Sequence, residues 1–158
     1  MANDKGTDLN PYLINNNQGP ERNAGIKWEW AHRVIINPGA KVIYRFSFDA
    51  WFENAVIIYD MEFLDPLAER GNYSRTMDDF EFKNDSNKHV EHIITGWHKG
   101  SPPKASKPWY HSPKLVFPMQ TEKVVMVGFS DDQANDGKTD PYYFNDGLVS
   151  IIYYKGED

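Results

Sequence analysis

The sequence lacks cysteine and long apolar runs. With no cysteine among its 158 residues, the fold does not depend on disulfide bonds, and cysteine-based zinc sites and thiol nucleophiles are excluded. No apolar run approaches the roughly 20 residues that a membrane-spanning helix needs, so we expect no membrane insertion. The opening residues, MANDKGTDLN, show no signal peptide. We expect a cytoplasmic protein, or one exported by a non-classical route that acts at cell surfaces.

Positive charge is scarce. The chain has 17 Lys and Arg residues against 23 Asp and Glu residues, which gives a net charge of −6. Sequence-independent binding of nucleic acid needs a basic surface, so this balance argues against a nucleic-acid partner. A neutral ligand, or one that is held through a cation, fits the charge better.

Short apolar runs rich in Val, Ile and aromatic residues dominate the sequence, and no long stretch repeats apolar residues with the period of a helix. Residues 41–49 (KVIYRFSFD) alternate apolar and polar side chains, as a half-buried strand does. Residues 65–88 are polar and predict a long excursion. The strand candidates are residues 26–36, 41–49, 55–64, 80–82, 89–97, 114–118, 122–130 and 147–155. We predict an all-β fold, a single jelly-roll-like β-sandwich with antiparallel sheets over residues 26–158, after an extended or partly ordered leader over residues 1–25.

Side-chain oxygens gather in residues 129–149, FSDDQANDGKTDPYYFNDGLV, between the last two predicted strands. Calcium takes six to eight oxygen ligands, and this segment offers Asp131, Asp132, Asn135, Asp136, Asp140, Asn145 and Asp146. The alternative is a solvated turn, because Asp, Asn and Gly are also the commonest turn residues. An EF-hand is excluded, because a loop starting at Asp132 would place Ala134 third and Tyr143 twelfth.

No motif of a catalytic site is present. The sequence has no GxSxG elbow, P-loop or GxGxxG segment. His89 and His92 are three residues apart, which places them on opposite faces of a strand. We therefore expect a protein that is not an enzyme.

The tryptophans divide into two groups. Three lie in or beside strand patterns and are expected in the core or in an interface: Trp28, Trp30 and Trp51. Trp109-Tyr110-His111 lies in a polar loop flanked by proline. There an aromatic ring either stacks on the apolar face of a sugar or packs the loop against the domain.

The order of these elements resembles that of the LecA-type (PA-I) galactophilic lectins of bacteria. The matching stretches are VIINPGAKVIYRFSFDAWFEN (34–54), HIITGWHKGS (92–101), KLVFPMQTEKVVMVGFSDD (114–132) and NDGLVSI (145–151). The resemblance implies a galactose-binding-domain-like sandwich that binds galactose-type or related sugars through two hydroxyls coordinated to Ca²⁺. It also implies multivalency as a homo-oligomer.

Carried over to this sequence, the resemblance implies calcium ligands at the Asn54 carbonyl, Asp131, the Tyr142 carbonyl, Asn145 and Asp146. In strict register the last two ligands would be Phe144-Asn145, and Phe144 cannot coordinate. The expected sugar-binding residues are Asp131, Asp132, Tyr142 and Asn145, with Trp109 and His111 beside them.

Two departures from that family stand out. The loop between Asp131 and Asn145 is longer than the family's, and the family's His-Pro-x-Gln segment has no counterpart in residues 65–88. The alternative function is therefore a non-catalytic β-sandwich module for protein interaction that has lost the sugar site.

Overall fold

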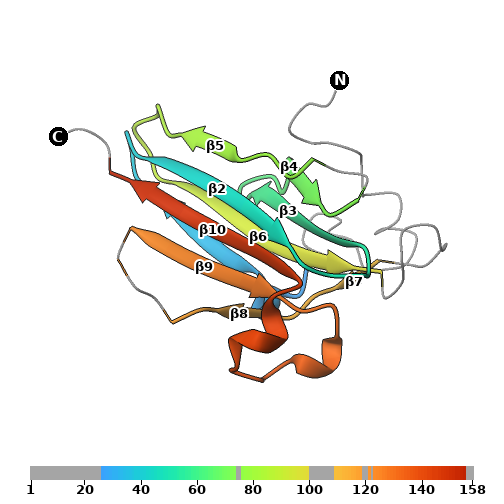
Figure 1. Ribbon diagram of the computed structural model, residues 1–158. Coiled ribbons are helices and arrows are strands. Elements are labelled where there is room, and N and C mark those ends of the chain that lie inside the picture. Colours follow the sequence, from blue (N-terminus) through green and yellow to red (C-terminus); the bar gives the residue numbers. More distant parts are fainter. Residues whose placement is uncertain (1–25, 74–75, 100–108, 119–120, 122, 156–158) are drawn as a thin grey trace.

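The computed structural model describes residues 26–73, 76–99, 109–118, 121 and 123–155. Two five-stranded antiparallel sheets face each other (Figure 1). The first has the order β1-β6-β3-β4, with β7 also paired to β6, and the second has the order β5-β2-β10-β9-β8. The strands are β1 (His32–Ile36), β2 (Lys41–Phe48), β3 (Asn54–Asp60), β4 (Pro66–Gly71), β5 (Phe80–Lys83), β6 (Val90–His98), β7 (Tyr110–His111), β8 (Lys114–Val116), β9 (Val124–Phe129) and β10 (Gly147–Tyr154).

The predicted all-β sandwich is confirmed. The helical elements of the described residues are three short 3-10 turns, η1 (Trp28–Trp30), η2 (Gln133–Asn135) and η3 (Pro141–Phe144). No helix in these residues is long and apolar enough to cross a membrane. The predicted leader over residues 1–25 lies outside the described part of the chain, as do residues 100–108 of the proline-rich loop.

Two apolar clusters hold the sandwich together. The larger lies between the sheets and includes Val42, Tyr44 and Phe46, the inward side of the alternation in β2. The smaller covers the outer face of the first sheet, around Trp97 and Trp109. Strand β3 lies between the two clusters, so six of its seven residues are buried and its residues 55–59 form a continuous apolar run.

Two segments differ from the sequence-based expectation. Residues 26–36 do not form one strand, because η1 occupies Trp28–Trp30 before β1 begins. The polar excursion also contains an unpredicted strand, β4, whose Glu69 and Arg70 are buried. Arg70 is satisfied inside the protein: its Nε donates to the Asp78 carbonyl at 2.6 Å, and its guanidinium carbon lies 5.5 Å from the Phe46 ring centroid. A buried charge of this kind needs such partners, and partners distant in sequence cannot be seen in the sequence pattern.

Strand β10 runs through the second sheet from one end of the sandwich to the other. Its first residue, Gly147, pairs with Phe48 of β2 and Phe129 of β9, and its last, Tyr154, pairs with Lys41. The two ends of β10 therefore define the two ends of the molecule (Figure 1).

Candidate functional site

Three neighbouring strands bring aspartates to the end of the sandwich where β10 begins. Asp49 directly follows β2, Asp146 directly precedes β10, and Asp131 lies two residues beyond β9. The Asp49 N–H donates to the Asp146 carbonyl at 3.1 Å, and the Asp131 N–H donates to Asp146 Oδ2 at 3.0 Å. We call this group of three the acidic end.

Burial and mutual repulsion perturb the two inner carboxyl groups. Burial, followed by the charges of Asp131 and Asp49, raises the pKa of Asp146 to about 6, although the Asp131 backbone N–H opposes the shift. Burial is also the main cause that raises the pKa of Asp131, and the charge of Asp132 adds to it. The hydrogen bond from the Asp131 N–H to Asp146 Oδ2 holds the two carboxyl groups close together. A cation placed between them would remove the repulsion and favour both ionised forms.

Asn54 links this pair to the opposite sheet. It begins β3, its Nδ2 donates to the Phe52 carbonyl at 3.1 Å, and its side chain lies near enough to the Asp131 carboxyl group to oppose the rise in the pKa of that group. The loop that leads into Asn54 is fixed by Asn72, whose Oδ1 accepts from the Asn54 N–H at 2.9 Å and whose Nδ2 donates to the Ala50 and Phe52 carbonyls at 3.2 and 2.9 Å. The site is therefore held in place before any ligand binds.

Two aromatic rings stand exposed beside the acidic end. Trp51 is 72% exposed and Tyr142 is 71% exposed, the largest values among the exposed large hydrophobic side chains of the described residues. Trp51 lies two residues after Asp49, and the Tyr73 hydroxyl donates to its carbonyl at 2.8 Å. Tyr142 lies in η3, four residues before Asp146. Of the two expectations for Trp51, core or interface, the core is therefore excluded, whereas Trp30, at 6% exposed, is in the core.

The structure brings together three of the predicted calcium ligands, Asn54, Asp131 and Asp146. Asn145 is half-buried at the end of η3, beside Asp146. Phe144 is fully buried, so the residues at the surface here are Asn145 and Asp146. The shifted register, with Asn145 and Asp146 as ligands, stays a prediction.

Close packing against β9 fixes the position of the loop before β10. A side chain at Gly128 would collide with the carbonyl oxygen of Phe144, so η3 can lie directly on β9 only where glycine stands. The N-terminus of η3 is capped by Asp140, whose Oδ1 accepts from the Tyr142 N–H at 3.0 Å. The other predicted sugar ligand in this loop, Asp132, is exposed and caps η2 through the Ala134 N–H at 2.9 Å.

Trp109 and His111 do not belong to the candidate site. They are 1% and 4% exposed, and the His111 ring lies 4.3 Å from the Trp97 ring, centroid to centroid. Burial lowers the pKa of His111 to about 3, so the imidazole is neutral. A sugar cannot stack on a ring inside the outer cluster, and the alternative of loop packing is the correct one for this segment.

The donors of the acidic end fit calcium in kind. Carboxylate, amide and backbone carbonyl oxygens are the ligands that calcium prefers, and Asp131, Asp146 and Asn54 supply them. The Asn54 carbonyl accepts a long hydrogen bond, 3.4 Å from the Asn72 N–H. Among the described residues, no three His, Cys, Asp or Glu side chains converge closely enough to hold a metal ion. A complete shell would therefore need backbone carbonyls, Asn145 and ligand hydroxyls as well.

Two residues of this end were missed in the sequence, Asp49 and Trp51. Asp49 ends the alternating pattern of residues 41–49, and this pattern predicts only that a strand ends there. Its role follows only from the pairing of β2 with β10, which places it opposite Asp146.

No protein-family model matches the sequence, and no curated protein matches it significantly. Among solved structures, the C-terminal domain of the BC2L-C lectin from Burkholderia cenocepacia aligns with a TM-score of 0.50 and 12% identity, over 79% of this chain and 96% of that one. The lectin CV2L of Chromobacterium violaceum, solved in complex with alpha-methyl-fucoside, gives a TM-score of 0.49 and 12% identity over 82% and 98% of the two chains. The high-affinity mannose-binding lectin of Ralstonia solanacearum gives 0.46 and 12% over 82% and 98%. The first likeness shows that the chain has the fold of a bacterial lectin domain, and it shows the fold alone.

Proposed function

We propose that the protein is a lectin that binds carbohydrate at the acidic end without catalysing a reaction. The observation that carries the proposal is the neighbouring pair of carboxyl groups, Asp131 and Asp146, in the acidic end, whose aspartates lie close in sequence to Trp51 and Tyr142, the two most exposed large aromatic rings of the described residues. Carboxylates accept hydrogen bonds from sugar hydroxyls, and an aromatic ring covers the apolar face of a sugar. The neighbour that shares the fold is itself named as a lectin.

We further propose that calcium takes part. Asp131 and Asp146 would hold the ion with the Asn54 and Tyr142 carbonyls and the Asn145 side chain. When bound, calcium would supply coordination positions for two neighbouring sugar hydroxyls. The residues of this chain would fix the orientation of those hydroxyls, because an epimer with one hydroxyl misplaced leaves a buried acceptor unpaired.

The sugar class that we propose is galactose or a related sugar, as the resemblance to LecA-type lectins implies. Single sugar sites bind weakly, so we also propose that the protein acts as a homo-oligomer that presents several sites to glycans at a cell surface.

Thermal unfolding with and without calcium tests the metal. A native-state site raises the free energy of unfolding by RT ln(1 + [Ca]/Kd), which is about 2.7 kcal/mol at 100 times Kd. We expect the Tm to rise in millimolar calcium and to fall again with EDTA. A Tm that calcium does not move removes the ion from the proposal.

A glycan array with and without EDTA tests the sugar, with two matched variants. Asp131→Asn removes one carboxylate of the pair, whereas Asp85→Asn removes an exposed carboxylate whose side chain is 81% accessible in a pair with Lys83. We expect Asp131→Asn to lose glycan binding and Asp85→Asn to keep it, with both variants folded. Glycan binding that persists in Asp131→Asn would place the sugar elsewhere, and no binding by the parent protein to any glycan would favour the protein-interaction module.

A further inference from the structure

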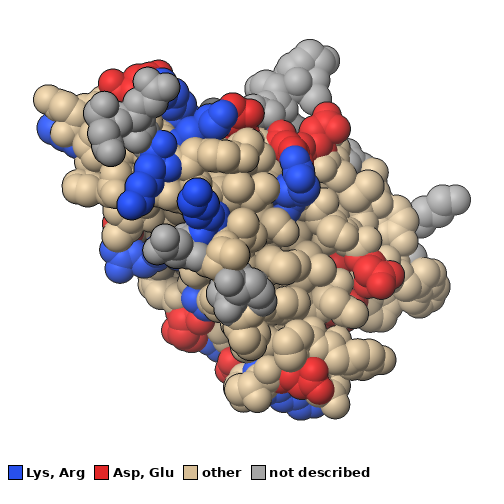
Figure 2. Space-filling view, turned by 60° about the vertical axis from the view of Figure 1, so that its left-hand side comes forward, with Lys and Arg blue, Asp and Glu red and all other residues tan. Residues whose placement is uncertain are grey.

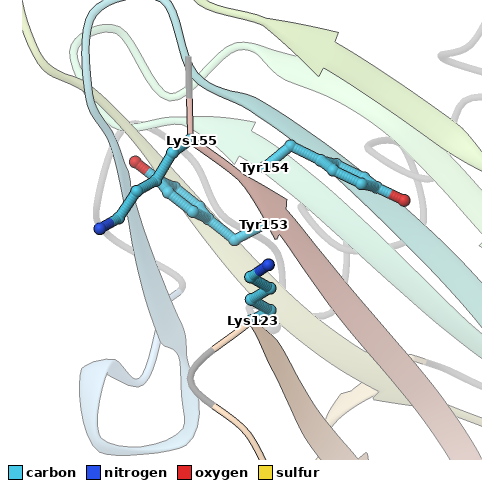
Figure 3. A pocket seen from close by; sticks show the side chains of 4 residues that line it. All are labelled: Lys123, Tyr153, Tyr154 and Lys155. Atoms are coloured by element: carbon cyan, nitrogen blue, oxygen red, sulfur yellow. The ribbon is translucent and has the colours of Figure 1, made fainter. Parts of the chain in front are cut away.

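Two adjoining hollows lie at the end of the sandwich where β10 finishes. One, of about 540 Å³, is lined by Lys123, Tyr153, Tyr154 and Lys155 (Figure 3). The other, of about 210 Å³, is lined on one side by β1 and on the other by residues of β9 and β10. Lys123 and Tyr153 line both, so the hollows are joined. We call them together the basic cleft.

The charge of this cleft is opposite to that of the whole chain. Its described lining residues include Arg33, Lys123 and Lys155 but no Asp or Glu, in a chain with a net charge of −6. Arg33 is paired with Glu91 at 2.6 Å. Neither lysine forms an ion pair with any described residue.

Other parts of the same end show that this sign is local. A third hollow there, of about 500 Å³, includes the acidic residues Asp60, Glu62 and Glu91 in its lining. Figure 2 shows Lys and Arg side chains gathered on the face that is turned forward, with acidic side chains nearer its margins. The local field in the basic cleft therefore favours an anion.

The tyrosine side chains of the cleft are held in place. The Tyr153 hydroxyl accepts a hydrogen bond from the Asn37 N–H at 3.1 Å, and the Tyr153 N–H donates to the Lys123 carbonyl at 2.8 Å. The Tyr154 ring has the Lys41 ammonium group 5.1 Å from its centroid. Figure 3 shows the two rings extending to opposite sides of β10, with the Lys123 side chain beside the stem of Tyr153.

Apolar side chains complete the cleft. Val34 and Ile35 of β1 line the smaller hollow together with Val125 and Ile151, and Ile35 is 55% exposed. A ligand that suits these walls has an anionic group for the lysines and a ring with an apolar face for the aromatic and aliphatic side chains. The larger hollow lies within the size range of small-molecule sites, about 300 to 1,000 Å³.

From this combination we propose that the basic cleft is a second ligand site, which binds an anionic saccharide, that is, a sugar ring bearing a sulfate or a carboxylate group. Lys123 and Lys155 pair with the anionic group, and the exposed Tyr154 ring covers the sugar ring. The proposal does not rest on the function proposed for the acidic end, because no residue is shared between the two sites.

Calorimetric titration of the full chain tests the proposal. The probes are a disaccharide carrying one 6-sulfate, the same disaccharide without sulfate, a uronate-containing disaccharide, and inorganic sulfate, all in EDTA so that a calcium site does not contribute. We expect an anionic disaccharide to bind at least about tenfold more tightly than the neutral one, as one charge-assisted hydrogen bond provides. The sulfated and uronate arms show which anionic group is preferred. Equal affinity for the neutral and both anionic disaccharides, or for inorganic sulfate and the sulfated disaccharide, overturns the proposal.

Matched variants show whether the cleft itself is responsible. Lys123→Ala with Lys155→Ala removes both cations, and we expect a loss of about tenfold or more in affinity for the anionic disaccharide. The single-charge control is Lys138→Ala, whose ammonium group lies 4.2 Å from the Tyr143 ring centroid at the other end of the sandwich. Lys138→Ala should change the affinity for the anionic disaccharide less than twofold. Lys123→Ala alone, which also removes one positive charge, should lower that affinity more. If Lys138→Ala and Lys123→Ala lose the same amount of affinity, the ligand is attracted by the overall charge of the protein and not by the cleft. That result would overturn the proposed site.

The aromatic contact has its own test. Tyr154→Ala is expected to weaken binding of the anionic disaccharide about threefold to tenfold, while leaving the weak binding of inorganic sulfate unchanged. If Tyr154→Ala binds the anionic disaccharide and inorganic sulfate more weakly by the same factor, Tyr154 does not recognise the sugar ring. The saccharide is then the wrong ligand.

Discussion

The two ends of the sandwich are built on the same central strand but present opposite chemistry. Asp146 precedes β10 and lies between Asp49 and Asp131, whereas Tyr153 and Tyr154 finish the same strand beside Lys123. At the acidic end the like charges are pressed together and partly buried, which raises the pKa of Asp146 to about 6. At the basic end Lys123 and Lys155 stand apart at the rim of the cleft (Figure 3). A strained carboxyl pair favours a cation, whereas an open basic cleft favours an anion.

The largest expected effect is acid destabilisation, which acts on the whole sandwich and so affects both ends. Burial lowers the pKa of His92 and His98 to about 4 and that of His111 to about 3, from a usual value near 6.5. Below pH 6.5 the unfolded chain therefore binds protons that the folded chain does not, and stability falls with pH at about 1.4 kcal/mol per unit for each such proton.

The titration of Asp146 changes the stability in the direction opposite to that of the histidines. Its folded pKa of about 6 exceeds the usual 3.8, so the folded chain binds a proton first as the pH falls from about 6 to 4, and this offsets one histidine. The net loss in the free energy of unfolding should still amount to several kcal/mol between pH 6.5 and 4.5. That is a large part of the total stability of a typical domain. Urea unfolding at stepped pH measures it. A midpoint that does not change over this range would contradict the buried, neutral histidines.

The next effect should be confined to the acidic end. Gly128→Ala places a methyl group against the Phe144 carbonyl and should displace η3 from β9. Overpacking of this kind costs about 1–3 kcal/mol. We expect loss of glycan binding at the acidic end with the basic cleft unchanged.

Two kinds of measurement check the Gly128→Ala prediction. Urea unfolding measures the loss of stability, and titrations with a glycan and with the anionic disaccharide measure binding at the acidic end and in the basic cleft. Gly137→Ala is the control, since its added methyl group would meet no atom within 4 Å, although its φ of +87° carries some strain of its own. If Gly128→Ala binds glycan normally, the position of η3 does not matter for the site.

A smaller effect is expected from Asn72→Ala, which releases the loop before β3. The variant removes the amide that donates to Ala50 and Phe52 and accepts from Asn54. Each lost hydrogen bond is worth about 0.5–1.5 kcal/mol, and the Asn54 contact with Asp131 should loosen. We expect a lower Tm and about tenfold weaker glycan binding, measured by differential scanning calorimetry and titration. Unchanged glycan affinity despite a lower Tm would separate the loop from the site.

Trp51→Ala should have the smallest effect on stability and a selective effect on binding. The ring is 72% exposed, and surface substitutions usually change stability by less than about 0.5 kcal/mol. Loss of a stacking surface should weaken glycan binding about threefold to tenfold. Phe63→Ala, at a 55% exposed ring outside the acidic end, is the control. Equal affinities of the two variants would remove stacking by Trp51 from the account.

The sequence predicted the parts of the molecule that depend on local pattern. The alternation in residues 41–49 gave β2, and the oxygen-rich ends of the 129–149 segment indicated Asp131 and Asp146, which do lie together. Parts that depend on distant partners could not be found in this way. Strand β4 carries Glu69 and Arg70, which read as surface residues until Arg70 meets the Asp78 carbonyl and the Phe46 ring.

The aromatic residues show the same limit. Local context placed Trp51 in the core or in an interface and left Trp109 open between sugar stacking and loop packing, whereas in the structure Trp51 is 72% exposed and Trp109 is 1% exposed. Trp109 is buried because the outer face of the first sheet needs an apolar cover around Trp97, and nothing near Trp109 in the sequence reveals that need.

The most direct test of the central claim is a map of amide chemical shifts in the ¹⁵N-labelled chain during titration with a methyl galactoside, with calcium and then with EDTA. The account predicts shifts at Asp131, Asp146, Asn54 and the Trp51 indole in calcium, their loss in EDTA, and no shift at Lys123 or Tyr153. The contradicting result is a calcium-loaded protein whose acidic end does not respond to any simple sugar, or a response centred on other residues.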